Sequence, residues 1–208
     1  PDNTILETFD LVAESSGVTP SGVAVTDVSD NGTDVDANND GIAASEGEDT
    51  PTPVSISANP IVGVVQQTID TDGDGQVIDL VDAGDENLPL DERPLTYRTT
   101  FAIDIANMGN TDLEQLEVVN FLTSTFPSLV EKGAITIPPG GIRIVAGPNT
   151  VMINENYDGV LDANLLNSLN SSLAEGESIR IELELYIQVD YSDTAAIEEL
   201  QRQNFSNQ

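Results

Sequence analysis

The sequence contains no cysteine, no histidine and no tryptophan, and these absences exclude whole classes of chemistry. Without cysteine the chain forms no disulfide and offers no thiol nucleophile. Without cysteine and histidine it cannot build the nitrogen and sulfur sites that hold zinc or copper, so any metal must be held by oxygen atoms. Lys132 is the single lysine and lies in an expected turn, so no base is evident for a serine or threonine nucleophile. We therefore expect a protein that is not an enzyme.

Positive charge is also scarce. Six basic residues stand against 37 acidic ones, the net charge is −31, and every basic residue lies at Arg93 or later. Because like charges raise the free energy of a compact state, the first half of the chain needs either screening salt or bound divalent cations. This charge also argues against nucleic acid and an anionic membrane surface as partners.

Aromatic residues make up 4% of the chain, and long apolar runs are missing. No segment approaches the roughly 20 apolar residues that a membrane-spanning helix requires, and no signal peptide is visible. The chain begins at Pro1 without a methionine, so we expect a mature or excised piece. Branched aliphatic side chains must form the core, which favours sheets.

Alternation of apolar and polar residues is clearest over residues 95–105 and 178–189, which predicts two long strands. Only residues 193–203 have the pattern of a helix of any length, with single helical turns expected at 121–127 and 163–169. Shorter strands are expected at residues 4–13, 22–28, 61–67, 113–120, 134–137, 142–146 and 150–153. Many short strands without crossover helices predict an all-β fold, an antiparallel β-sandwich with long acidic loops.

Two acidic loops repeat the spacing of a calcium-binding loop. The first runs from Asp36 through Asn38 and Asp40 to a glycine, and the second runs from Asp70 through Asp72 and Asp74 to a glycine. Carboxylates two residues apart in a tight turn converge on one point, and Ca²⁺ takes six to eight oxygen ligands. Both loops therefore predict calcium sites.

Neither loop is an EF-hand, because the twelfth positions are Gly47 and Val81 instead of an acid, and no helices flank them. Other carboxylates would have to close each site, from Glu46, Glu48 or Asp49 in the first loop and from Asp79 or Asp82 in the second. The predicted metal ligands are Asp34, Asp36, Asn38, Asp40, Asp70, Asp72, Asp74, Asp79 and Asp82. The alternative is that both loops are solvated acidic linkers, the usual role of charge runs.

Three segments of the chain resemble a known repeat. The run PLTYRTTFAIDIANMGNTDLEQLEVVNFLTSTFP (94–127) is similar, in order and spacing, to the Ig-like tandem repeat of large bacterial surface proteins. Segment 21–56 resembles the acidic connector before such a repeat, and segment 154–189 resembles its closing half. The matching positions are Tyr97, Asn107, Gly109, Asn110, Leu113 and Val118, with Asn120 where the family usually has aspartate.

The resemblance implies an Ig-like sandwich of about seven to nine strands and a structural or adhesive role at the bacterial cell surface, without catalysis. The partners would be copies of the same chain, stacked end to end in an extracellular fibre or filament. The likeness ends after residue 189, where the family's closing strand is missing. The segment at residues 4–13 looks like that missing strand.

This offset leads to the hypothesis that the N-terminal strand of one unit completes the sandwich of a neighbouring unit. The alternative is that the segment folds back on its own domain. We expect an N-terminal strand segment at 1–28, an acidic connector at 29–60 and the Ig-like sandwich at 61–208.

Two further functions remain open from the sequence. A carbohydrate-binding module would contact surface glycans, although the chain offers only four tyrosines and no tryptophan as ring platforms. A glycosidase would use a pair of carboxylates, but acidic pairs are so frequent in this chain that their presence carries no information.

Overall fold

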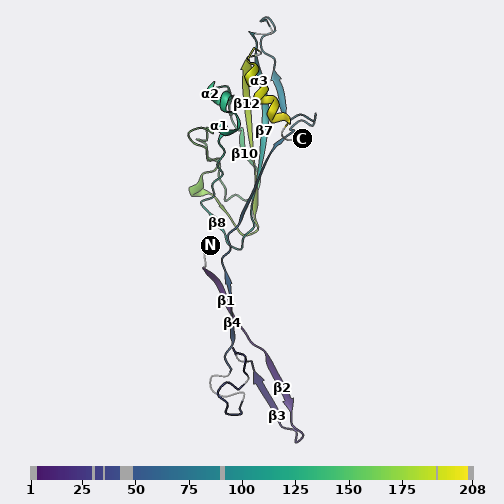
Figure 1. Cartoon of the computed structure of the whole chain (residues 1–208), viewed down its shortest axis with the longest axis vertical. Helices are drawn as coiled ribbons and strands as arrows, with labels where there is room; N and C mark the ends of the chain where they lie inside the picture. Colours follow the sequence, from purple (N-terminus) through teal and green to yellow (C-terminus); the bar gives the residue numbers. More distant parts are fainter. Residues whose placement is uncertain are drawn as a thin grey trace. The chain divides into compact units, whose positions relative to one another are not determined.

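The computed structural model describes residues 4–29, 31–34, 36–42, 49–89, 92–190 and 192–205. The protein is mostly β, with 42% strand and 11% helix, and its sheets are antiparallel. The prediction of an all-β, antiparallel chain is confirmed at that level. The chain divides into two compact units, unit 1 from Pro1 to Asn59 and unit 2 from Pro60 to Gln208 (Figure 1).

Unit 1 consists of two antiparallel ribbons of two strands each. β1 (Ile5–Leu11) pairs with β4 (Thr52–Ser57), and β2 (Glu14–Val18) pairs with β3 (Ala24–Val28). The sequence predicted a turn where β2 lies and a connector where β4 lies, because serine, glycine and proline are frequent in both. Since β1 pairs with β4, the expected N-terminal segment and most of the expected connector belong to one unit.

Unit 2 is built on a six-stranded sheet whose two long central strands are β7 (Pro94–Asn107) and β12 (Ser178–Asp190). These are the strands that the alternation predicted, and they pair over their whole length. Along its other edge β7 pairs with β5 (Val62–Ile69) and β6 (Ile78–Asp82), whereas the other edge of β12 pairs with β10 (Ile142–Ala146) and β9 (Ile135–Thr136).

The core lies on one face of this sheet, here called the inner face. Every second residue of β12 from Ile179 to Val189 is buried there, and Phe101, Ile103 and Ile105 of β7 are buried beside them. Burial of branched aliphatic side chains at this period is the physical reason that these segments form strands, because one pleated face is removed from water.

The layer over the inner face is largely irregular. It contains α1 (Leu122–Thr125), α2 (Pro127–Glu131), η2 (Ser168–Asn170) and the two-residue strands β8 (Leu113–Glu114) and β11 (Ser172–Leu173). Phe126, Leu129 and Leu165 of this layer are completely buried, and the Phe126 ring packs edge-on against Phe101 with centroids 6.2 Å apart. α3 (Thr194–Phe205), which the sequence predicted, adds Ala196 and Leu200 to the core.

Strands predicted at 113–120 and 150–153 are mostly absent, and side chains accept or donate some of the hydrogen bonds of the backbone in this layer. Asn164 Oδ1 accepts the Val118 N–H at 3.0 Å and the Leu166 N–H at 3.2 Å. Asn107 Nδ2 donates to the carbonyl oxygens of Thr111 and Leu173. A loop whose backbone groups are satisfied in this way needs no strand partner.

Arginines on the outer face of the sheet are paired with acidic residues. Arg180 lies opposite Asp104 at 3.3 Å, and Arg143 lies opposite Glu182 at 2.5 Å, each pair directly across two strands. Opposite charges at such positions stabilise strand pairing modestly. No helix in the described part of the chain is long and apolar enough to cross a membrane.

Candidate metal centre

The second acidic loop interrupts a strand at the edge of the sheet. Ile69, the last residue of β5, lies opposite Thr100 of β7, and Ile78, the first residue of β6, lies opposite the adjacent Thr99. β5 and β6 therefore follow one line along β7, and residues 70–77 loop out between them. The Thr99 hydroxyl donates to the Val77 carbonyl at 2.9 Å and closes the base of the loop.

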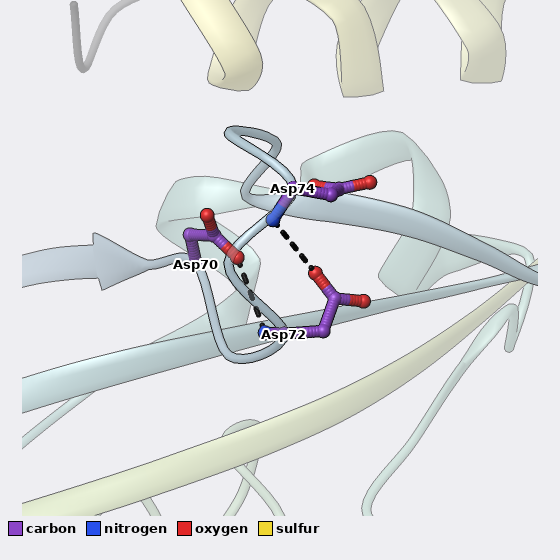
Figure 2. A group of neighbouring side chains, drawn as sticks. All are labelled: Asp70, Asp72 and Asp74. Carbon is purple, nitrogen blue, oxygen red and sulfur yellow. Dashed lines mark hydrogen bonds between the residues drawn. The ribbon is translucent and has the colours of Figure 1, made fainter.

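Asp70, Asp72 and Asp74 come together at the start of this loop, where all three side chains are exposed (Figure 2). One carboxylate oxygen from each lies within 4.8 Å of the others. Two oxygens bound to the same Ca²⁺ at about 2.3–2.6 Å can be at most about 4.6–5.2 Å apart. Three carboxylates at this spacing could hold one calcium ion.

Asp70 organises the turn. Its Oδ1 accepts the N–H of Gly73 at 2.7 Å, and its Oδ2 accepts the N–H of Gly75 at 2.7 Å. Gly75 has φ +88°, a conformation that side chains other than glycine rarely adopt, so the glycine of the motif is required for this turn. Each carboxylate oxygen has two lone pairs, so an oxygen that accepts a hydrogen bond can still bind a cation.

The same hydrogen bonds set the charge of Asp70. The backbone N–H groups of Gly75 and Gly73 lower the pKa of Asp70 below its usual value, because they stabilise the ionised carboxylate. The loop therefore keeps its leading carboxylate charged, as a metal ligand must be, down to more acidic pH than a free aspartate.

Arg98 supplies a positive charge beside the loop. Its Nη2 lies 3.2 Å from Asp72 Oδ2 and 2.7 Å from Asp79 Oδ2, and the hydrogen bond to Asp79 is the main reason that the pKa of Arg98 is raised. Asp79 lies directly opposite Arg98 in the strand register. Arg98 therefore bridges Asp72 and Asp79 and partly neutralises both carboxylates.

The structure separates the other residues predicted for the second loop from the three clustered aspartates. Asp79 is in β6 and bound to Arg98, and Asp82 accepts the N–H of Gly84 at 2.9 Å. Neither belongs to the cluster formed by Asp70, Asp72 and Asp74.

The first acidic loop makes a similar turn, in which the leading aspartate again accepts the N–H of the glycine five residues later. Asp36 accepts the N–H of Asp40 through Oδ1 at 3.0 Å and the N–H of Gly41 through Oδ2 at 3.0 Å. Asn38 Nδ2 donates to Asp40 Oδ2 at 3.1 Å, and Asp34 accepts the N–H of Asp36 at 3.3 Å. Glu46 and Glu48, considered for closing this site, lie outside the described residues.

A third loop with this spacing escaped the sequence reasoning. Asn154, Asn156, Asp158 and Gly159 repeat the order of the first two loops, and Asp158 Oδ1 accepts three backbone N–H groups between residues 160 and 162. These bonds lower the pKa of Asp158. Its signal in the sequence was N-x-N-x-D-G, which a search for aspartate at the first position overlooks.

Comparison with family models, curated proteins and solved structures gives no match to this chain. Three exposed carboxylates are a donor set of the kind that a hard divalent cation prefers.

Proposed function

We propose that this chain is a structural and adhesive module of an extracellular bacterial surface fibre, and that its copies join end to end by strand pairing through unit 1. The observation that carries the proposal is the state of unit 1: none of its described residues is buried. A two-stranded ribbon in water is marginally stable at best, so unit 1 needs a partner surface.

The β1–β4 ribbon has an apolar face and a polar face. Phe9 lies opposite Val54, and Leu11 and Ile56 lie on the same side, with 40 to 66% of each of these four side chains exposed. Glu7, opposite Ile56, is the acidic residue on this side. On the other side Thr8 and Ser55 share a hydrogen bond of 3.3 Å. Covering the exposed part of the apolar face would contribute about 1 kcal/mol for each side chain. This amphipathic pattern supports a role in assembly.

We also infer that the loop at Asp70, Asp72 and Asp74 binds Ca²⁺ and that the first acidic loop contributes a second site. A bound cation would stiffen the edge of the sheet, because the loop connects β5 and β6, which pair with adjacent residues of β7. It would also reduce the repulsion within a chain of net charge −31. This role requires no catalysis.

The finer fold belongs to the same proposal. The sheet of unit 2 and the layer over its inner face would form an Ig-like sandwich that a strand from a neighbouring copy completes. The uncovered edge of the sheet at β5 supports this, since Val62 and Val64 are 56% and 69% exposed there.

The experiment is to follow the molar mass of the full chain by light scattering over a range of concentrations, in 1 mM and in 0.01 mM Ca²⁺ at about 1 M salt, where charge repulsion is screened. We expect open-ended oligomers that lengthen with concentration and appear as fibres by electron microscopy. A chain that stays monomeric at every concentration tested would exclude the proposed function.

A further inference from the structure

The inner face of unit 2 is left open along β5. This strand ends the sheet order, so one of its edges has no strand neighbour among the described residues. Asn120 Nδ2 donates to Gln66 Oε1 at 3.0 Å, which places the segment around Asn120 beside β5. Val119 and Phe121 on either side of it are 55% and 48% exposed. These two residues and Val62 and Val64 are exposed apolar side chains on β5 or flanking Asn120, and the region is here called the β5 opening.

A strand laid along β5 would close this opening. It would bond to the free backbone groups of the edge and extend the inner face over the exposed valines. The incoming strand needs an apolar side, and it should carry no negative charge, because the chain around it is strongly acidic. β5 itself, VGVVQQTI, has no charged residue.

β4 meets both requirements. Its sequence is TPVSIS, without a charged residue, whereas β1 contains Glu7 and Asp10. Val54 and Ile56 lie on the apolar face of the ribbon, and β4 has one edge not paired with β1. Pro53 has no N–H to donate, so the new ladder would run over Val54–Ile56.

The linker between β4 and β5 of one chain is a poor β-hairpin turn. Ala58 belongs to the ribbon, because its N–H donates to Thr4 O, and Ile61 belongs to the sheet, because its carbonyl accepts the Met108 N–H. A hairpin that joined β4 directly to β5 would therefore have only Asn59 and Pro60 as its turn residues. In such a turn Pro60 would be the second central residue. Proline is disfavoured at that position of a type I turn, and it cannot adopt the positive φ that types I′ and II require there. A type II′ turn would need positive φ at Asn59, which the following proline disfavours.

We propose that the free edge of β4 in one copy pairs with the free edge of β5 in a second copy, and that Val54 and Ile56 cover Val62 and Val64 of the acceptor. This assignment rests on the proposed function and specifies its contact. The contact is heterologous, with one donor edge and one acceptor edge in each copy, so it propagates into an open chain of copies.

The test compares two lysine substitutions at opposite ends of the same sheet. V64K places a charge in the β5 opening, and V145K places the same charge on β10, where Val145 is 44% exposed. Lysine on an edge strand is an effective block to strand addition. We expect V64K to weaken association of the full chain at least about tenfold and V145K to leave it within about twofold of the wild type, by light scattering.

A mixing experiment guards against a folding defect. V64K keeps its donor edge on β4 but has a blocked acceptor edge on β5. Added to wild-type protein, it should bind the free β5 edge at the end of an oligomer and stop growth there, so the oligomers become shorter. V145K should be incorporated without shortening them. Cooperative thermal melting checks that unit 2 is folded in both variants. If wild type assembles and V64K assembles equally well, the β5 contact is wrong although assembly stands. If wild type does not assemble at all, the proposed function itself fails.

Discussion

At the scale of single residues, asparagine, aspartate and glycine determine the shape of the covering layer of unit 2. Asp158, Asn164 and Asn107 accept or donate hydrogen bonds that strand neighbours would otherwise provide. Tyr157 is buried in the same region and donates its hydroxyl to Asn120 O at 3.0 Å, and burial raises its pKa. A buried phenol that already has an acceptor supports packing and has no evident chemical role.

Gly159 provides a prediction at this scale. It has φ +71°, and a Cβ at this position would lie 2.4 Å from Leu122 Cγ, which belongs to a buried side chain. We expect G159A to lower the free energy of unfolding by about 2–5 kcal/mol, through left-handed backbone strain together with overpacking. The measurement is urea denaturation of the full chain.

Gly140 offers a matched control for this substitution. Its φ is +75°, but nothing lies within 4 Å of the position that a Cβ would occupy. G140A should therefore cost only the backbone strain, about 1–2 kcal/mol. Equal losses in the two variants would mean that the contact with Leu122 contributes nothing.

At the scale of elements, β5 and β6 pair one after the other with β7, and the loop between them carries the candidate metal centre. The sequence predicted the loop, but it predicted no strand over 78–82, because that segment contains two aspartates and lies within an acidic stretch. The strand forms because Asp79 faces Arg98 on the neighbouring strand and Ile78 is buried. Local charge was overridden by a partner 19 residues away along the chain.

This arrangement separates two aspartates that the sequence treated alike. We expect D70N to raise the dissociation constant for Ca²⁺ at least about tenfold, because Asp70 is in the cluster and contributes a charge to it. D82N, which removes the same charge outside the cluster, should change it less than about twofold. Isothermal titration of both variants at moderate ionic strength provides the comparison.

Two results would contradict the metal centre. The first is a wild-type chain that takes up no Ca²⁺ in this titration. The second is an equal loss of affinity in D70N and D82N, which would indicate diffuse attraction to the acidic surface.

At the scale of the whole molecule, the two units differ in what holds them together. Unit 2 has a continuous core of branched aliphatic side chains, whereas the described residues of unit 1 are joined by ribbon and loop hydrogen bonds without a buried core, and its sequence contains no lysine or arginine. Opening of unit 1 should therefore require much less free energy than opening of unit 2, since little apolar surface is exposed in the process.

Limited proteolysis tests this difference. Trypsin has no site before Arg93, so a protease of broad specificity is needed. In dilute protein we expect rapid loss of residues 1–59 and accumulation of a resistant fragment that begins near Pro60. Raising the protein concentration should slow cleavage of unit 1 while leaving the rate within unit 2 unchanged, because assembly covers the ribbon. Equal cleavage of both units in dilute protein would show that unit 1 is held by contacts of its own.

The sequence by itself determined the β class, the two long central strands, the terminal helix and the tight turns of the two acidic loops. These features depend on short-range rules: the period of two in residues 95–105 and 178–189, and glycine at positions that require positive φ. Tertiary structure alone decided that β1 pairs with β4, that Arg98 binds Asp72 and Asp79, and that asparagine side chains replace strands over the inner face. Those outcomes depend on which distant segments meet, and a local pattern contains no information about the partner that satisfies its backbone or balances its charge.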